Sequence, residues 1–415
     1  MDSELLKTFK SLFTIYNDNK NILLDFKENH LEELFEKEIS NINKGIYLIF
    51  MKAIDYKASD IHFENFNNYL KIRFRINGIL KEILKIDKDL SPLIFSKIKI
   101  LASLDIVEKR RPQDGRFSLV YKKREIDFRT SFISTINGEK LVIRILDKNN
   151  MNLTINDLYM SEEDKILFFK AIGQNSGIIL VNGPTGSGKS TTLYTILKYK
   201  NSEELNISTV EDPIEYQIEG INQSQCKNEI GLSFSAILKS LLRQDPDILM
   251  IGEIRDKETA EIAVKASLTG HLVFSTLHSN NTLGCINRLL NLEIDPYLLS
   301  IVLVMIISQR LVRKLCPNCK KVDTNFQKKL ESLGIDLKTH EKTIFYTHSS
   351  NGCSNCMYTG YVGRFPIFEI LFFDDSNKEK LLNKSKLNLK KNLLVDAIDK
   401  AQLGLTSLDE ILRQI

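Results

Sequence analysis

One glycine-rich segment has the residue types and spacing of a phosphate-binding loop. It fits G-x-x-x-x-G-K-[ST] and follows the apolar run at 177–182. In this motif, backbone N–H groups surround phosphate oxygens, and the helix that follows adds the positive end of its dipole. Lys189 is expected on the β- and γ-phosphates and Ser190 on a Mg²⁺ ion. The predicted nucleotide-binding residues are Gly183, Pro184, Thr185, Gly186, Ser187, Gly188, Lys189, Ser190 and Thr191.

Hydrolysis needs carboxylates that handle water and metal, and two stand at the ends of apolar runs. Glu211 follows 207–210, and Glu253 follows 248–251 and a glycine. Ligands bind at the carboxyl ends of parallel strands, so both are candidates. Glu211 would face the γ-phosphate if its strand neighbours the strand before the loop. Either one alone fits a solvated loop carboxylate equally well; together with the loop, they favour a catalytic site.

Four of the six cysteines form two C-x-x-C pairs, Cys316 with Cys319 and Cys353 with Cys356. Two thiolates on each of two tight turns can fill all four positions of a tetrahedral Zn²⁺ site, so a structural zinc is predicted. The segment between the pairs, 320–352, is longer than the usual about 15–20 residues, which leaves unrelated thiols as the alternative. Cys226 and Cys285 match no pair and are interpreted as ordinary thiols.

A parallel α/β sheet is expected to position the loop and the carboxylates. Apolar runs at 177–182, 207–210, 248–251 and 272–276 alternate with helical patterns, as in strands joined by helices. The apolar stretch 298–307 is about half the ~20 residues of a membrane-spanning helix and is predicted to be one buried helix.

An α+β domain is expected before this sheet. Residues 69–76 alternate like a strand, and Asn77-Gly78 is a strong hairpin signal. A second strand pair brackets Lys122-Lys123, and 91–104 has a helical pattern.

Length and composition indicate a multidomain globular protein. The 415 residues exceed what one core usually serves, and 43% are hydrophobic and 27% charged. The predicted division is a helical lead-in at 1–45, an α+β domain at 46–147, a linker at 148–160, a P-loop ATPase core at 161–308, a zinc-binding module at 309–370 and a C-terminal helical region at 371–415.

The charge balance and the start of the chain bear on location and partners. The formal charge is +4, from 57 basic and 53 acidic residues, which does not favour nucleic acid as the principal partner. The first residues show no export signal, so a cytoplasmic protein is expected. The Lys-rich stretch 377–392 fits a solvated helix surface better than a contact with anionic lipid.

Several segments together resemble the secretion ATPase superfamily, specifically the type II secretion and type IV pilus assembly ATPases. In these ATPases a four-cysteine module stands where this chain has its two pairs. Asn77 departs from the usual pattern, in which an aspartate stands there. The matching segments cover nearly the whole chain after about residue 46 and are 58–62, 73–78, 111–116, 183–191, 208–215, 242–256, 269–278, 309–313 and 359–364.

The resemblance implies an architecture and a set of partners. Each subunit of a homohexamer would have a RecA-like P-loop ATPase domain preceded by a smaller α+β, PAS-like domain. ATP, Mg²⁺ and a structural Zn²⁺ are the implied cofactors. The implied partners are an inner-membrane platform protein, its cytoplasmic adaptor and, indirectly, pilin or pseudopilin subunits, with no direct nucleic acid.

The resemblance also implies roles for single residues. Glu211 would be the general base and Glu253 the carboxylate that acts on Mg²⁺, with exchange of the two roles left open. The implied γ-phosphate sensors are His278 and His271, although lone histidines are more often structural. Arg116 and Arg129 would offset charge in phosphoryl transfer, with surface or sheet-edge arginines as the alternative.

Three functions are consistent with these features. The leading one is an ATP-hydrolysing motor that assembles pilin-like filaments for protein secretion, pilus extension or DNA uptake. The second is a nucleic-acid translocase with the same core, which the charge balance disfavours. The third is a nucleotide-gated scaffold that binds ATP without turnover.

Overall fold

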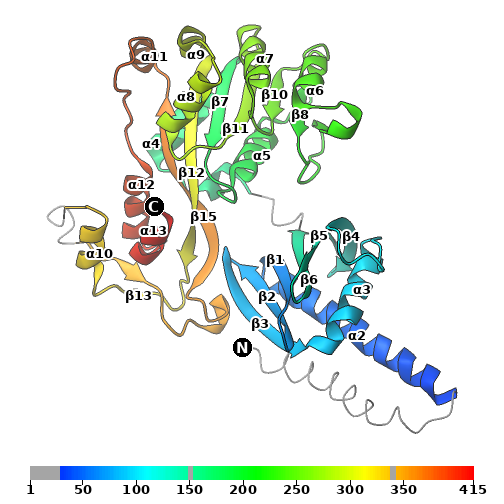
Figure 1. The fold of residues 1–415 in the computed structure, drawn as a ribbon. Helices are drawn as coiled ribbons and strands as arrows, with labels where there is room; N and C mark the ends of the chain where they lie inside the picture. The colour runs from blue at the N-terminus through cyan, green and yellow to red at the C-terminus, as the bar shows by residue number, and fades with distance from the viewer. Residues whose placement is uncertain (1–28, 148–152, 337–342) are drawn as a thin grey trace. The chain divides into compact units, whose positions relative to one another are not determined.

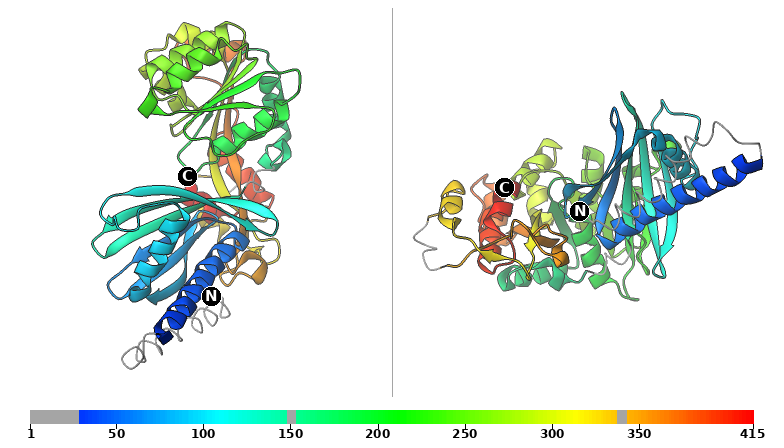
Figure 2. Two further views of the ribbon diagram at one scale, coloured as in Figure 1. Left: turned by 90° about the vertical axis from the view of Figure 1, so that its right-hand side faces the viewer. Right: turned by 90° about the horizontal axis from the view of Figure 1, so that it is seen from below.

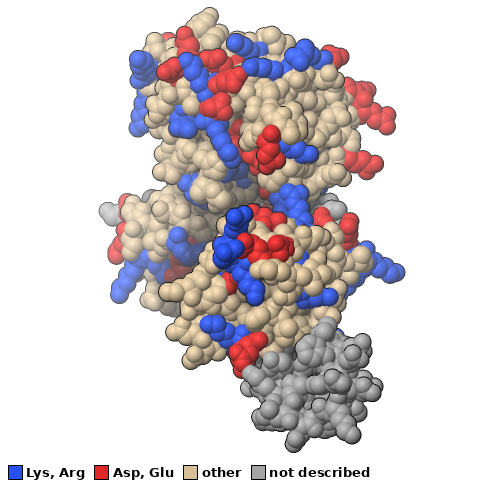
Figure 3. Space-filling model, turned by 45° about the vertical axis from the view of Figure 1, so that its right-hand side comes forward, with Lys and Arg blue, Asp and Glu red and all other residues tan. Residues whose placement is uncertain are grey.

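The computed structural model describes residues 29–147, 153–336 and 343–415 (Figure 1). The chain divides into two compact units, Met1–Asn150 and Met151–Ile415, called unit 1 and unit 2 below. Within the described ranges, no helix combines the length and apolar character needed to cross a membrane. Basic and acidic side chains are interspersed on the face drawn in Figure 3.

Unit 1 is a six-stranded antiparallel sheet with helices α2 and α3 packed on one face (Figures 1 and 2). The strand order is β3-β2-β1-β6-β5-β4. Alternate strand residues such as Phe63 and Phe128 pack against Phe50 and Ile94 of the helices to form the core. The elements are α2 (Asn29–Asp55), β1 (Ala58–Asn65), β2 (Tyr69–Ile76), β3 (Ile79–Asp87), η1 (Lys88–Leu90), α3 (Ser91–Leu101), β4 (Gln113–Tyr121), β5 (Arg124–Thr135) and β6 (Gly138–Asp147).

Both predicted hairpins of unit 1 are confirmed. Asn77 and Gly78 join β2 to β3 with φ of 50° and 82°. Lys122 and Lys123 join β4 to β5 with φ of 49° and 62°. Positive φ at both central positions gives the two-residue turn whose twist matches the strands. The helix expected at 91–104 is α3, which ends at Leu101.

Unit 2 is a seven-stranded sheet with helices on both faces (Figures 1 and 2). The order is β15-β12-β7-β11-β10-β8-β9, and every neighbouring pair is parallel except β15 with β12. The four strands predicted from apolar runs are confirmed as β7, β8, β10 and β11. The strands are β7 (Gly177–Asn182), β8 (Ile207–Glu211), β9 (Asn222–Gln225), β10 (Ile248–Ile251), β11 (Leu272–Leu277), β12 (Leu303–Leu315) and β15 (Tyr361–Phe372), with β13 (Lys321–Val322) and β14 (Tyr346–Thr347) paired separately.

The helices that cover the parallel strands of unit 2 form two layers. Helices α4 and α5 pack against strand residues such as Ile179 and Phe274, whereas α6 to α9 pack on the other face against residues such as Leu180 and Val273. The helices are η3 (Ile155–Leu158), α4 (Glu162–Ile172), α5 (Lys189–Lys200), η4 (Asn228–Ile230), α6 (Phe234–Leu241), α7 (Lys257–Leu268), α8 (Thr282–Asn291), α9 (Pro296–Val302), α10 (Phe326–Ser332), η6 (Ser354–Cys356), α11 (Asp375–Leu382), α12 (Leu393–Gln402) and α13 (Leu408–Gln414).

The expectation of one buried helix at 298–307 is wrong in its second half. Helix α9 ends at Val302, and β12 begins at Leu303 and pairs with β7. A short, continuous apolar run does not distinguish a buried helix from a buried strand. The second half of the stretch forms a strand because the edge of β7 is available for pairing.

The structure differs from the expected division at several boundaries. Helix α2 continues through residue 45 without a break. Ile155, Leu158 and Met160, expected in a linker, are buried in the core of unit 2, because each inserts an apolar side chain under the sheet. Strands β12 and β15, expected to lie largely in a separate zinc module, belong to the main sheet.

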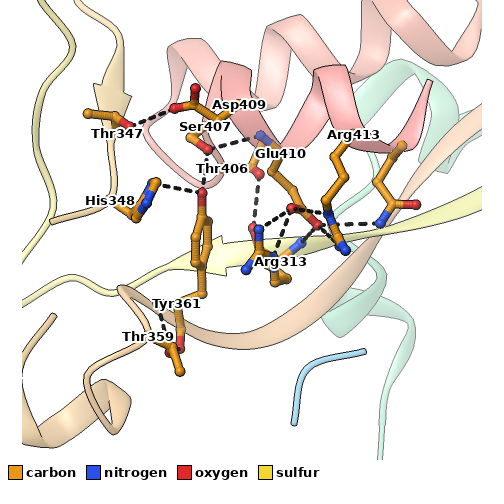
Figure 4. Close-up of polar contacts among 11 residues, drawn as sticks. Arg313, Thr347, His348, Thr359, Tyr361, Thr406, Ser407, Asp409, Glu410 and Arg413 are labelled. Atoms are coloured by element: carbon orange, nitrogen blue, oxygen red, sulfur yellow. Dashed lines mark hydrogen bonds and ion pairs between the residues drawn. The ribbon is translucent and has the colours of Figure 1, made fainter. Parts of the chain in front are cut away.

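A buried polar network holds helix α13 against β12 and β15 (Figure 4). Glu410 has 0% of its surface exposed and accepts hydrogen bonds from Arg313 at 2.6 Å and Arg413 at 2.8 Å. The Tyr361 hydroxyl lies 2.7 Å from Ser407 Oγ. Charge-assisted bonds of this length are strong, so they fix the end of the chain on the sheet.

Candidate functional site

The glycine-rich loop connects β7 to α5 at the carboxyl edge of the unit 2 sheet. Gly183, Gly186 and Gly188 all have positive φ, which glycine adopts without a steric penalty. A Cβ at Gly183 would lie 2.5 Å from the carbonyl oxygen of Gln309, and one at Gly188 would lie 2.8 Å from Gln309 Nε2. The loop therefore needs glycine at these two positions for close packing against β12.

The polar groups of the loop suit an anionic ligand. Lys189 Nζ donates to the carbonyl oxygens of Gly183 at 2.8 Å and Pro184 at 3.1 Å. Ser187 Oγ is buried and has no hydrogen-bond partner in the described part of the chain. Ser190 and Thr191, at the start of α5, are exposed. An orphan hydroxyl and an ammonium group beside a helix start match the donors that phosphate oxygens use.

Gln309 of β12 is a support for the loop that the motif itself does not identify. Its Nε2 donates to the Ser187 carbonyl oxygen at 2.7 Å, and its Oε1 accepts from Thr192 Oγ1 at 2.8 Å. Its side chain is 1% exposed. The amide thus ties the loop and the first turns of α5 to the neighbouring strand. In the sequence, Gln309 stands out only as part of the family-matching segment 309–313. No local spacing identifies its role, because its contacts join residues far apart in the chain.

Glu253, His278 and Lys189 come together at this edge. Glu253, just after β10, forms an ion pair with Arg255, and its Oε2 lies 3.7 Å from His278 Nε2. Burial lowers the pKa of Lys189, an effect that the charge of Glu253 opposes and that of Arg310 reinforces. Burial, with the charge of Lys189, also lowers the pKa of His278. A neutral imidazole therefore lies near the loop lysine at pH 7.

Glu211 lies farther along the same edge. Its strand β8 does not neighbour β7, because β11 and β10 stand between them, so the condition under which Glu211 would face the γ-phosphate is not met in this sheet. The carboxylate is 4% exposed and accepts hydrogen bonds from Tyr194 Oη, from Thr209 Oγ1 at 2.6 Å and from Gln223 Nε2 at 3.1 Å. Nothing in the sequence indicates this shell, since its members come from α5, β8 and β9.

His271 is not brought to this edge. It precedes β11, its carbonyl oxygen accepts from Gly177 N at 3.2 Å, and its Nδ1 lies 2.8 Å from the Ala266 carbonyl oxygen. The six residues of β7 separate that position from the glycine loop, about 20 Å at the rise of a strand. Within one chain, His271 is therefore remote from the nucleotide site.

Arg116 and Arg129 lie on unit 1, directly opposite each other on β4 and β5. Arg144 on β6 pairs with Arg129 in turn, so three arginines occupy one row across the sheet. The row continues to Asp60, which Arg144 approaches to 3.4 Å and Arg75 to 3.5 Å. Residues in register share a face, so these arginines lie on the face opposite the helices.

The four paired cysteines form one cluster in unit 2, with all Sγ atoms within 4.8 Å of one another. The Sγ separations are 3.7 Å for Cys316–Cys353 and 3.8 Å for both Cys319–Cys356 and Cys353–Cys356. A tetrahedral ion with Zn–S bonds of about 2.3 Å needs sulfur atoms about 3.8 Å apart, so the residues fit zinc.

The cluster also has donors for thiolate charge. The backbone N–H groups of Cys353 and Gly360 lie 3.1 Å and 3.2 Å from Cys356 Sγ. Burial raises the pKa of this thiol, but these hydrogen bonds and those from the neighbouring cysteines lower it to about 6. Thiolate is the form that binds metal, so the predicted metal cluster is consistent with the chemistry of its surroundings.

Known proteins resemble this chain in sequence and fold. Residues 36–413 match the family model described as Type II/IV secretion system protein. Type II secretion system ATPase E of Vibrio cholerae is 45% identical over 394 residues, covering 92% of this chain and 77% of that protein. Type IV pilus assembly ATPase PilB of Myxococcus xanthus is 45% identical over 380 residues, covering 89% and 67%.

Among solved structures, the crystal structure of the pilus retraction motor PilT with bound ADP has a TM-score of 0.57 and 25% sequence identity, covering 88% of this chain and 95% of that one. The fold of this chain is therefore the α/β fold of a secretion or pilus ATPase. The family resemblance inferred from the sequence is confirmed. This chain belongs to the type II/IV secretion system protein family, together with ATPases of type II secretion and type IV pilus assembly.

Proposed function

We propose that this protein is a cytoplasmic, ATP-hydrolysing motor that works as a homohexamer and powers assembly of pilin or pseudopilin filaments. The observation that carries the proposal is the meeting of Lys189, Glu253 and His278 beside the glycine-rich loop. Together they supply a phosphate cradle, a metal ligand and a group that can contact the γ-phosphate.

The nucleotide and its metal have defined partners in this proposal. ATP would occupy the loop, with the buried Ser187 hydroxyl and the Lys189 ammonium donating to phosphate oxygens. Ser190 and Glu253 are the proposed Mg²⁺ ligands. Mg²⁺ would draw charge from the β- and γ-phosphates, while the chain's own groups orient them.

Glu211 is proposed as the general base. In the described chain its hydrogen-bond donors are uncharged, whereas Glu253 already forms an ion pair with Arg255. The Oε2 atom of Glu253 lies beside His278 at the loop edge, which favours Glu253 as the metal ligand. Exchange of the two roles is the alternative.

The remaining parts follow from the family. Unit 2 is proposed to be RecA-like and unit 1 PAS-like. Arg116 and Arg129 are proposed to reach a bound nucleotide and offset negative charge, an idea supported by the row of arginines that they share with Arg144. A structural Zn²⁺ in the cysteine cluster is supported by the sulfur separations.

The proposed partners are an inner-membrane platform protein and its cytoplasmic adaptor, through which the protein would attach peripherally to the membrane. Pilin or pseudopilin subunits are the indirect load. This part rests on relatives named for type II secretion and type IV pilus assembly. No direct contact with nucleic acid is expected.

Steady-state ATPase activity with Mg²⁺ tests the proposal, with oligomeric state recorded for each sample. Wild type and the exposed control Lys265→Ala should turn over ATP, Lys189→Ala should lose binding and turnover, and Glu211→Gln should bind ATP but keep only residual turnover. A wild-type hexamer that binds ATP but never hydrolyses it, even with its platform protein, would contradict the motor and favour a nucleotide-gated scaffold.

A further inference from the structure

Tyr194 of α5 is buried beside Glu211 and has its hydroxyl proton directed by two contacts. The ring is 1% exposed and packs edge-on against Tyr216, with centroids 4.5 Å apart. The hydroxyl oxygen accepts from the Glu215 backbone N–H at 3.4 Å and donates to Glu211 Oε2. In the Glu215 contact the hydroxyl oxygen is the acceptor, so the single hydroxyl proton is available to be donated to the Glu211 carboxylate.

The position of Tyr194 on its helix connects Glu211 to the nucleotide site. Helix α5 begins at Lys189, and Tyr194 stands four residues after Ser190. Residues at i and i+4 share a helix face about 5–6 Å apart, and helical side chains lean towards the N-terminus. The Tyr194 hydroxyl thus extends towards the turn that carries the proposed Mg²⁺ ligand.

We propose that Tyr194 is a positioning residue that fixes Glu211 relative to the P-loop helix, so that its free lone pair faces the water that attacks ATP. This inference rests on the proposed function. Thr209 and Gln223 both donate to Oε1, so only Oε2 retains an unused lone pair, and Tyr194 is the group that orients this oxygen.

Loss of the Tyr194 hydroxyl should lower turnover. The carboxylate would sample orientations in which Oε2 no longer faces the water, and misplacement of a base by about 1 Å lowers turnover markedly.

Other titratable groups surround Glu211. Asp212 and Glu215 follow it in the chain, and Tyr216 packs on Tyr194. Cys226, after β9, donates its backbone N–H to the Glu211 carbonyl oxygen. Burial raises the pKa of both tyrosines and of the Cys226 thiol, so these three remain protonated and neutral near pH 7.

The test compares Tyr194→Phe with Tyr216→Phe in the full chain. Both remove one hydroxyl from the same ring pair, but among the described contacts only Tyr194 donates to Glu211. Tyr194→Phe should lower kcat about tenfold with unchanged affinity for a fluorescent ATP analogue. Tyr216→Phe should stay within about twofold of wild type.

A double-mutant cycle with Glu211→Gln separates positioning from a general loss of structure. If Tyr194 acts through Glu211, adding Tyr194→Phe to Glu211→Gln should lower turnover no further. Additive losses, equal losses in both Phe variants, or wild-type or higher turnover in Tyr194→Phe would each overturn the inference. An inactive wild type would instead overturn the proposed function, so the two failures are distinguishable.

Discussion

Gln309 uses both ends of its amide to hold the nucleotide loop, through the Ser187 carbonyl oxygen and Thr192 Oγ1. Gln309→Leu keeps the approximate volume but leaves both partners unsatisfied in a buried place. Each lost bond is worth about 1 kcal/mol, so ATP affinity should fall about tenfold or more. Equilibrium titration with a fluorescent nucleotide measures this, with exposed Gln327→Leu as the control; equal affinities would contradict the supporting role.

The glycines of the loop are not equivalent. Gly183→Ala would place a Cβ 2.5 Å from the Gln309 carbonyl oxygen, a backbone atom that cannot move aside cheaply. Gly186→Ala meets no atom within 4 Å and carries only the strain of its φ of 79°. Nucleotide affinity should therefore fall far more in Gly183→Ala than in Gly186→Ala. Similar losses in the two variants would show that conformation, and not packing against β12, sets the requirement.

At the scale of single residues, local spacing predicts Lys189, Ser190 and the cysteine pairs, because each of these motifs consists of residues close together in the sequence. Glu211 and Glu253 were predicted as carboxylates at strand ends. The different surroundings of the two side chains could not be predicted from the sequence. The roles of Tyr194 and Gln309 depend on contacts between segments distant in the chain, which no spacing rule contains.

At the scale of elements, strands with continuous apolar runs and hairpins with turn signals were predicted correctly. β9 was missed because its sequence, Asn222 to Gln225, has no apolar pattern and gains strand structure by pairing with β8. The stretch 298–307 was assigned to helix throughout because its periodicity is ambiguous, and its neighbours in the sheet decide the outcome.

The cysteine cluster is expected to be an element that depends on its metal. Wild type should contain one zinc per chain by atomic absorption, and Cys353→Ser should lose it together with on the order of 5 °C in Tm. Cys285→Ala, a buried cysteine outside the cluster, should keep its zinc. Wild type purified without zinc that resists chelators and still melts like the holoprotein would contradict a structural metal.

The stability of the packing of helix α13 should fall in acid because of Glu410. Burial raises the pKa of this carboxyl, but Arg413 and Arg313 lower it overall. Its contribution to stability is therefore present above about pH 4.3, the ordinary glutamate value, and is lost as pH falls through the depressed folded pKa. Glu410→Ala leaves two guanidinium groups unpaired and should lose about 3 kcal/mol at pH 7.

Urea unfolding of unit 2 at pH 7 and at pH 4 measures the Glu410 effect. Glu410→Gln should also flatten the loss of stability between these two values, whereas exposed Glu379→Gln should behave like wild type. A Glu410→Gln protein with the wild-type pH dependence would show that the network does not set the acid response of the helix.

At the scale of the whole molecule, charge argues against a nucleic-acid load. The net charge is +4, and charges of both signs are interspersed on the drawn face (Figure 3). Because the net charge is nearly balanced, binding to DNA should be weak and strongly salt-dependent. ATPase activity should therefore be unchanged by single- or double-stranded DNA at physiological salt. Stimulation that saturates with DNA would revive the translocase.

Strand β12 has a mechanical consequence of its own. It passes Gln309 under the glycine-rich loop and ends at Leu315, immediately before Cys316. From Gln309 to Leu315 the strand pairs with β15 alone, and at the rise of a strand this segment places the loop and the cysteine cluster on the order of 20 Å apart. A force applied to the cysteine cluster is therefore expected to reach the glycine-rich loop through this one strand.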